Sequence, residues 1–369
     1  MTDKQQDLPA EIIEKFQVLH EFAKAAKNNL NKNIYDYVFG GAETETTVKR
    51  NRMAIETHAL RPRVMRDVSK MNAGVDRFGM RLKLPVCLAP IGSLQQISSG
   101  GGAAAASGAG RFGCAHMLSS VCEPGMDAVA EAAPDACRIF QLYVRGDEDW
   151  VDDKVRQAQD LGYKAFAVTI DLDAYSRRER DISKRFVTAG RQAAVGETHQ
   201  ARFDWSDVDR IKKICKIPFI LKGIATAEDS KLAVEHGVDV VYVSNHGGRQ
   251  LDHGRGGLDV LPECVEAVNG QAQVWIDGGF MRGTDIVKAM ALGADMVGLG
   301  RLQALALAAG GEDALVRMLE ILEHEVQIAL MLLGVTGYDE LGPEYVYKEP
   351  LAVADPHQFS GFPLLGEGY

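Results

Sequence analysis

The stretch VDVVYVSNHG, residues 238–247, decides the fold. Its first six positions are β-branched or aromatic apart from one aspartate, a composition that favours an extended strand. A run that is apolar at consecutive positions is typical of a strand buried on both faces in a parallel sheet. The run then passes directly into Ser-Asn-His-Gly, so polar groups begin where the strand is expected to end.

Seven further runs of this kind occur along the chain. Each ends in glycine or polar residues, and the stretches between them are long enough for crossover helices. Eight units predict a closed (β/α)8 TIM barrel of the α/β class, although an open doubly wound sheet can also hold eight strands. The seven runs are PVCLAPIG (85–92), GCAHMLSS (113–120), RIFQLYV (138–144), AFAVTIDL (165–172), IPFILKGI (217–224), AQVWIDGG (272–279) and ADMVGLGR (294–301).

Helical patterns occupy much of the remaining sequence. TAEDSKLAVEHG (226–237) begins at a capping threonine and ends at glycine, and TDIVKAMALG (284–293) repeats that pattern. An amphipathic pattern at 8–30 predicts a helix that packs outside the barrel or closes its lower end, and 313–334 predicts another helix. The aperiodic stretch 188–205 is a candidate active-site loop.

No linker divides the sequence into two independent folds. We therefore expect one domain over residues 1–369. Its barrel core spans about 85–301, between an N-terminal helical extension at 1–84 and C-terminal helices and tail at 302–369.

Composition excludes several classes of function. The 41 basic and 51 acidic residues give a net charge of −10, and no basic block offers a surface for nucleic acid or an anionic membrane. No membrane-length apolar stretch or signal-peptide core is present, so we expect a cytoplasmic protein without membrane insertion. The six cysteines form no C-x-x-C pair, so we expect core cysteines and no metal site or disulfide framework.

Polar residues gather where the predicted strands end. In a (β/α)8 barrel these carboxyl ends converge on one mouth, where active sites lie. Buried polar groups without partners would be costly there, so the mouth is expected to bind a polar ligand. The residues are Ser119, Ser120, Gln141, Tyr143, Thr169, Asp171, Lys222, Asn245, His246, Arg249, Asp277, Gly278, Gly279, Gly300 and Arg301.

The segment VYVSNHGGRQLD (241–252) carries the most chemical information. Its two glycines allow close approach of the backbone to a ligand, and His246 and Arg249 combine a base with an anion-binding group. Asp171, from another strand end, can orient His246 and stabilise its imidazolium form. A lone histidine is more often structural, and Asp171 could also be a helix cap or a surface carboxylate. The strand-end position, the glycines and Arg249 favour the functional interpretation of His246.

Two glycine-rich turns predict a phosphate site. IDGGFMRGTD (276–285) and GLGR (298–301) follow the seventh and eighth strands, where barrels commonly bind phosphate. Backbone N–H groups freed by glycine, together with a cation, suit a phosphate dianion.

These motifs together resemble one family. SNHGGRQLD with ILKGI before it, IDGG and GLGR after it, QLYV and TIDLDAYSRRERD earlier, and IYDYVFGGAETETT near the start look like the FMN-dependent α-hydroxy-acid oxidases and dehydrogenases. This family includes glycolate oxidase, lactate oxidase and mandelate dehydrogenase. The motifs occur in the family's order from about residue 34 to about residue 340.

The resemblance implies roles at the substrate. His246 matches the base that removes a proton as the α-carbon is oxidised, and Asp171 matches its carboxylate partner. Arg249 and Arg178 match the guanidinium groups that clamp the substrate carboxylate. The phenols of Tyr37 and Tyr143 match groups that hydrogen-bond the substrate.

The resemblance also implies FMN as the cofactor. Lys222 matches the lysine beside flavin N1 and O2, where its charge stabilises the anionic reduced ring. The remaining cofactor-binding positions are Pro90, Ile91, Gly92, Ser119, Gln141, Thr169, Ser244, Asp277, Gly278, Gly279, Arg282, Gly300 and Arg301.

Three departures from the family pattern bear on these roles. Met281 stands where the family has the first arginine of the phosphate loop, which leaves Arg282 and Arg301 to neutralise the phosphate. Ile91 and Gly92 replace Thr-Ala, which predicts more space near flavin N5. Val121 replaces the tryptophan of glycolate oxidase, so a bulkier or unusual 2-hydroxy acid is expected.

The sequence therefore predicts an FMN enzyme that oxidises a small anionic L-2-hydroxy acid to the 2-oxo acid. The electron acceptor is O2 or a quinone or other electron carrier, and proton removal can accompany hydride transfer or precede it as α-proton abstraction. The family often forms tetramers, which implies a homo-oligomer. Two alternatives are another FMN- or phosphate-binding barrel enzyme, such as an isomerase or NAD-linked dehydrogenase, and a flavin-binding protein that has lost turnover.

Overall fold

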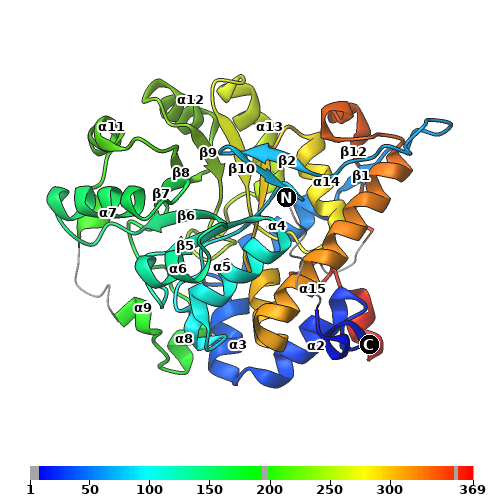
Figure 1. The fold of residues 1–369 in the computed structure, drawn as a ribbon, viewed down its shortest axis with the longest axis horizontal. Helices are drawn as coiled ribbons and strands as arrows, with labels where there is room; N and C mark the ends of the chain where they lie inside the picture. The colour runs from blue at the N-terminus through cyan, green and yellow to red at the C-terminus, as the bar shows by residue number, and fades with distance from the viewer. Residues whose placement is uncertain (1–7, 193–197, 353–355, 369) are drawn as a thin grey trace.

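The computed structural model describes the chain except residues 1–7, 193–197, 353–355 and 369. Eight parallel strands pair in sequence order and close into a barrel, because β11 pairs with β4 as well as with β10. The closed barrel confirms the predicted fold and excludes the open doubly wound sheet (Figure 1). The strands are β4 (Val86–Leu88), β5 (Ala115–Ser119), β6 (Cys137–Leu142), β7 (Ala165–Thr169), β8 (Phe219–Ile224), β9 (Val240–Val243), β10 (Gln273–Ile276) and β11 (Met296–Leu299).

Each of the eight predicted runs coincides with a strand, and every strand is shorter than its run. β9 ends at Val243, so Ser244 and His246 already belong to the loop above it. Every β9 residue is buried, as expected for a strand covered on both faces. The polar ends of the runs thus form the last residues of the strands, as Thr169 does in β7, and the loops of the barrel mouth.

Helices surround the barrel between its strands (Figure 1). The predicted cap of α12 is present, because the Thr226 side chain accepts a hydrogen bond from the Asp229 N–H at 3.1 Å. The helices are α5 (Gly101–Phe112), α6 (Met126–Ala132), α7 (Glu148–Asp160), α11 (Trp205–Ile214), α12 (Ala227–Glu235), α13 (Gly257–Val268), α14 (Gly283–Ala291) and α15 (Arg301–Leu333).

Two predicted helices have different bounds in the structure. The pattern at 8–30 forms α1 (Ala10–Lys15) and α2 (Leu19–Asn29), and α2 packs on α15 outside the barrel. The helix expected at 313–334 begins at Arg301 and is interrupted at Gly310 and Gly311, which have non-helical dihedral angles. This Gly-Gly break hides the first part of the helix from a search for helical periodicity.

The N-terminal extension contributes to both ends of the barrel. A hairpin of β2 (Val75–Arg77) and β3 (Met80–Leu82) lies at one end, where Phe78 and Met80 pack against buried interior residues. At the opposite end lie α3 (Lys32–Phe39) and α8 (Glu179–Ser183), which pack on one another (Figure 1). The smaller elements are α4 (Thr46–Glu56), α9 (Ala189–Gln192), α10 (His199–Arg202), the paired strands β1 (His58–Leu60) and β12 (Val346–Lys348), and the 3-10 helices η1 (Leu94–Gln96), η2 (Tyr338–Glu340), η3 (Pro343–Tyr345) and η4 (Pro363–Glu367).

All six cysteines are buried and free, in agreement with their predicted role as core residues. Among the helices of the described residues, none is both long enough and apolar enough to cross a membrane.

Candidate functional site

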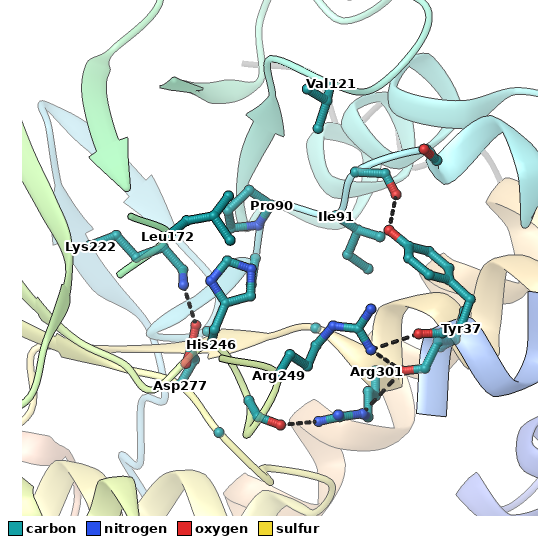
Figure 2. Close-up of a pocket in the computed structure, with 18 of the residues that line it drawn as sticks. Tyr37, Pro90, Ile91, Val121, Leu172, Lys222, His246, Arg249, Asp277 and Arg301 are labelled. Atoms are coloured by element: carbon teal, nitrogen blue, oxygen red, sulfur yellow. Dashed lines mark hydrogen bonds and ion pairs between the residues drawn. The ribbon is translucent and has the colours of Figure 1, made fainter. Parts of the chain in front are cut away.

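A cavity opens at the carboxyl ends of the barrel strands. Its walls come from the N-terminal extension and from loops after most of the strands, so distant segments meet there (Figure 2). Sixteen positions given a role or singled out by the sequence line it: Tyr37, Pro90, Ile91, Gly92, Val121, Tyr143, Arg178, Lys222, His246, Arg249, Asp277, Gly278, Gly279, Met281, Gly300 and Arg301.

His246 stands near the centre of this cavity, between Lys222 and Arg249 (Figure 2). Its Nδ1 lies 2.9 Å from Asp171 Oδ1, and its Nε2 lies 3.2 Å from the Tyr143 hydroxyl. The backbone of His246 has φ of +57°, a left-handed conformation that is uncommon outside glycine. The backbone N–H of His246 donates to Ser244 Oγ at 3.1 Å. The imidazole is therefore held at both ring nitrogens and at its backbone.

The charges around His246 favour a neutral imidazole beside an ionised carboxylate. Burial lowers the pKa of His246; Asp171 opposes this effect, whereas Lys222 and Arg178 lower the pKa further. Burial acts to raise the pKa of Asp171, but His246 and Lys222 outweigh it and leave the pKa below its usual value. A neutral imidazole next to a carboxylate can accept a proton and keep the resulting charge paired.

Two arginines face the same cavity. Arg249 Nη1 donates to backbone carbonyls of Tyr37 at 2.6 Å and Gly40 at 2.9 Å, and the guanidinium lies 5.0 Å from the Tyr37 ring centroid. Arg178 is buried, and its Nη2 donates to Gln250 Oε1 at 3.3 Å. Burial, followed by the charge of Arg178, lowers the pKa of Arg249 to about 9. Within the described residues, neither guanidinium forms an ion pair with a carboxylate, so the two groups together create a site for an anion.

The cavity wall at Gly92 leaves less free space than the sequence predicted. The Tyr37 hydroxyl donates to the Gly92 carbonyl at 3.0 Å. A Cβ atom at Gly92 would lie only 2.8 Å from Val121 Cγ2. Val121 therefore occupies the space that was predicted to open when alanine is replaced by Gly92.

A buried polar network lies beneath His246. Lys222 Nζ donates to Ser244 Oγ at 2.9 Å and lies 3.3 Å from Asp277 Oδ2. Ser244 Oγ in turn donates to Asp277 Oδ1 at 2.6 Å. These contacts hold the Lys222 ammonium at the cavity wall, where it can stabilise negative charge on a bound ring.

The buried polar atoms near the mouth fit a flavin ring. The amide atoms Oε1 and Nε2 of Gln141 and the hydroxyl of Thr169 are buried, and none of them has a hydrogen-bond partner within the described chain. Such groups are costly unless a ligand pairs them, and a flavin edge offers both donors and acceptors. Gln141 is the last residue but one of β6, and Thr169 ends β7, where it lies in register with Lys222 on β8. Ser119, at the end of β5, is also buried there.

The other end of the cavity fits a phosphate group. Gly278 and Gly279 have φ of +107° and +90°, and a Cβ atom at Gly300 would meet no described atom within 4 Å. Arg301 donates to the carbonyls of Gly247 at 2.9 Å and Gly40 at 3.0 Å, and burial lowers its pKa to about 10. Open backbone and a partly buried cation suit a phosphate dianion.

Arg282 does not line this cavity, although it was predicted to bind the cofactor. Its Nε donates to Glu325 Oε2 at 3.2 Å, and its Nη1 donates to the Gly361 carbonyl at 3.3 Å. Met281, by contrast, is buried and does line the cavity. Met281 therefore points into the cavity and Arg282 points away from it. Within the described residues, Arg301 is left as the cation at the phosphate end.

Several cavity residues were not identified from the sequence. Leu172 and Tyr175 follow β7, and Thr188 and Arg191 stand at the start of the aperiodic stretch that was proposed as an active-site loop. Tyr175 belongs to the quoted TIDLDAYSRRERD motif, which gave a signal for it. No sequence pattern distinguished Arg191 from the other arginines.

Comparison with known proteins agrees with this geometry. The profile of the family described as FMN-dependent dehydrogenase matches residues 26–348. Glycolate oxidase 1 of Oryza sativa is 36% identical over 358 residues, which cover 91% of this chain and 97% of that protein. 2-Hydroxyacid oxidase 1 of Homo sapiens is 34% identical over 361 residues, which cover 91% of this chain and 98% of that protein.

Solved structures give the same result. A mandelate oxidase variant with bound (S)-mandelic acid superimposes with a TM-score of 0.85 at 34% identity, covering 92% of this chain and all of that one. Mandelate oxidase with (S)-2-phenylpropionate superimposes with a TM-score of 0.83 at 33% identity, covering 90% of this chain and 98% of that one.

Proposed function

The chain belongs to the family of FMN-dependent dehydrogenases, and we propose that it oxidises a 2-hydroxy acid to the 2-oxo acid with His246 as the base and Arg178 and Arg249 as the carboxylate-binding groups. At the coarser level it is an FMN-dependent oxidoreductase that acts on CH–OH groups, of the 2-hydroxyacid oxidase type.

The observation that carries the proposal is the arrangement around His246. A neutral imidazole, hydrogen-bonded to a buried carboxylate, shares one cavity with two guanidinium groups. A 2-hydroxy acid brings one carboxylate and one hydroxyl-bearing carbon into such a cavity. Binding of the carboxylate by Arg178 and Arg249 would place that carbon within reach of His246 Nε2.

The chemistry divides between the cofactor and the protein. Oxidation of the alcohol removes two electrons and two protons from the substrate, and FMN, when bound, would accept the two electrons together with one of the protons. His246 Nε2 accepts one proton, and Asp171 stabilises the imidazolium that forms. The Tyr143 hydroxyl, 3.2 Å from His246 Nε2, can hydrogen-bond the substrate oxygen during this step. Lys222, in register with Thr169, would supply positive charge to the bound ring.

We propose O2 as the electron acceptor, because the related proteins are named glycolate oxidase and 2-hydroxyacid oxidase. A quinone or protein carrier is the alternative. Oligomeric assembly and a cytoplasmic location also remain proposals from the sequence.

Replacement of His246 tests the assignment of the base. His246→Ala should keep bound FMN but lower the rate of anaerobic flavin reduction by a 2-hydroxy acid about 10²–10⁴-fold, because the proton acceptor is lost. The rate is measured by stopped-flow absorbance near ~450 nm, where oxidised flavin absorbs. His324→Ala, an exposed histidine on α15, is the matched control and should react at the wild-type rate. Near-normal reduction of the His246 variant would remove this residue from its proposed role.

A further inference from the structure

A third arginine faces the substrate end of the cavity. Arg191, on α9, lines the cavity, and its guanidinium carbon lies 4.9 Å from the centroid of the Tyr175 ring. Its backbone N–H donates to Thr188 Oγ1 at 3.4 Å. Among the residues that the structure describes, no carboxylate forms an ion pair with the Arg191 side chain. Within the described part of the chain, the guanidinium thus faces the cavity beside an aromatic ring and without a paired carboxylate.

Arg191 lies close to the proposed carboxylate site. The guanidinium carbon of Arg178 is 5.7 Å from the centroid of the same Tyr175 ring, so the two guanidinium groups are separated by no more than the sum of the two ring distances. Asp181 is the carboxylate that interacts electrostatically with Arg178, Arg191 and Arg249 together, but it does not line the cavity. One buried carboxylate cannot neutralise three guanidinium groups.

A substrate with only one carboxylate does not balance the positive charge of the guanidinium groups of Arg178, Arg191 and Arg249. The proposed function uses Arg178 and Arg249 for that carboxylate, and Arg301 lies at the phosphate end. Among the described residues, Arg191 therefore has no ion-pair partner when FMN and a simple 2-hydroxy acid are bound. A guanidinium beside an aromatic ring at a cavity wall is well suited to bind a further carboxylate.

We propose that the preferred substrate is a short 2-hydroxy dicarboxylic acid, whose second carboxylate binds Arg191. This inference rests on the proposed function, because the first carboxylate occupies Arg178 and Arg249. Leu172, Val121 and Ile91 provide apolar surface elsewhere in the cavity, which suits the methylene groups between the two carboxylates.

Substrates matched in length test this proposal. Anaerobic flavin reduction and kcat/KM are measured with 2-hydroxyglutarate and with 2-hydroxyvalerate, which has the same five-carbon chain without the second carboxylate. Mandelate is included as an aromatic acid. The wild-type enzyme should prefer 2-hydroxyglutarate about tenfold or more, because a charge-assisted pair with Arg191 forms only with the dicarboxylate.

Variants of Arg191 should remove this preference. Arg191→Met keeps much of the length of the side chain without the charge, and it should lower kcat/KM for 2-hydroxyglutarate about tenfold or more, so that the ratio between the two acids approaches one. Arg191→Lys should recover part of the ratio. Arg202→Met, at an exposed arginine outside the cavity, is the matched control and should leave the ratio at the wild-type value.

A binding measurement separates a charge effect from a structural one. The non-reacting acids 2-oxoglutarate and 2-oxovalerate are titrated into oxidised enzyme, and binding is followed by the change in the flavin spectrum. Arg191→Met should weaken binding of 2-oxoglutarate selectively. An equal loss for both acids, or retained flavin with no change for either, would overturn the role of Arg191.

The two proposals fail in different ways. If no 2-hydroxy acid reduces the flavin, the proposed function fails and the substrate inference fails with it. If 2-hydroxyvalerate or mandelate reacts as well as 2-hydroxyglutarate or better, the proposed function stands and the dicarboxylate inference is overturned.

Discussion

His246 combines an uncommon backbone conformation with hydrogen-bond contacts at both nitrogens of its imidazole ring. Its left-handed φ of +57° would cost free energy in an isolated peptide, so the surrounding structure must hold it. The N–H bond to Ser244 and the Nδ1 contact with Asp171 provide that restraint. The conformation turns the imidazole into the cavity, directly after a strand whose own residues are buried.

Substitution of Asp171 tests the coupling of this pair. Asp171→Asn should lower the rate of flavin reduction about 10²–10⁴-fold, because the amide can neither stabilise the imidazolium nor hold the required tautomer. Because the pKa of His246 is lowered by burial, the wild-type kcat/KM should fall as pH decreases through a value below ~6.5. Above that value it should stay constant until the pH approaches about 9, the pKa of Arg249. Loss of the carboxylate should move this midpoint to still lower pH, since Asp171 is the group that raises the pKa of His246. Stopped-flow reduction across the pH range measures both effects.

The matched control is Asp173→Asn, which alters an exposed carboxylate two residues away. It should retain the wild-type rate. A midpoint that stays in place in Asp171→Asn would show that the titrating group is not His246.

The sequence predicted which polar residues meet at the barrel mouth more accurately than it predicted the directions of their side chains. Strand-end position predicted that His246 and Asp171 would converge, because parallel strands bring their carboxyl ends to one mouth. Arg282 was expected at the phosphate, but its direction depends on the neighbouring Glu325 on α15, far along the chain. Arg191 was missed because an aperiodic loop gives no signal for the direction of a side chain.

At the level of elements, β9 and β11 show how a large side chain inside the barrel restricts the size of the residue that faces it. Tyr242 on β9 points into the barrel, and a Cβ atom at Gly298 on β11 would lie 1.8 Å from its hydroxyl. Gly298 has no unusual backbone conformation, so glycine is required there by space and not by φ. The sequence predicted both strands, but the pairing of a large residue with a glycine across the interior needs three-dimensional register.

A substitution at Gly298 tests this interior packing. Gly298→Ala should lower the free energy of unfolding by about 1–3 kcal/mol, because the added methyl group displaces the Tyr242 ring in a closely packed interior. Urea unfolding followed by circular dichroism measures the change. Tyr242→Phe in the same chain should recover part of the loss, since it removes the nearest atom.

Gly125→Ala provides the comparison, because a Cβ atom there would meet no described atom within 4 Å and its φ is negative. It should change the free energy of unfolding by less than about 1 kcal/mol. Equal effects at Gly125 and Gly298 would contradict the packing explanation.

Across the whole molecule, the cavity joins segments that are remote in sequence. Asp252, in the loop after β9, accepts hydrogen bonds from the Thr47 N–H at 2.8 Å and the Thr44 hydroxyl at 2.6 Å. These bonds hold the segment that follows α3, and α3 itself supplies Tyr37 to the cavity. The N-terminal extension is therefore part of the site, which explains why the resemblance to the family begins at about residue 34 and not at the first strand of the barrel.

The charges that sum to the net value of −10 are unevenly distributed in the structure. Arg178, Arg191, Arg249 and Arg301 line one cavity together with Lys222, while acidic residues predominate in the chain as a whole. A total charge cannot predict this separation, because it depends on which loops the barrel brings together. The cavity can attract anions although the protein as a whole repels them.

The phosphate end of this cavity leads to a prediction about cofactor affinity. Within the described chain, Arg301 is the cation at the phosphate end. The buried side chain of Met281 lines the cavity where a second cation would otherwise stand. Met281→Arg should lower the dissociation constant for FMN about tenfold or more, because a further guanidinium can pair with the phosphate dianion. Titration of apoprotein with FMN, followed by quenching of flavin fluorescence, measures this constant. The melting temperature at a fixed excess of FMN should rise in parallel, since tighter binding to the folded state stabilises it.

Arg282→Met is the control, because Arg282 pairs with Glu325 outside the cavity. Its loss should leave the dissociation constant for FMN within about twofold of the wild-type value, even if removal of the ion pair lowers the melting temperature of the apoprotein. If Arg282→Met instead weakens FMN binding tenfold, Arg282 turns toward the phosphate in the complex, as the sequence predicted. If Met281→Arg leaves the dissociation constant unchanged, one guanidinium together with the backbone of Gly278, Gly279 and Gly300 is sufficient to bind the phosphate.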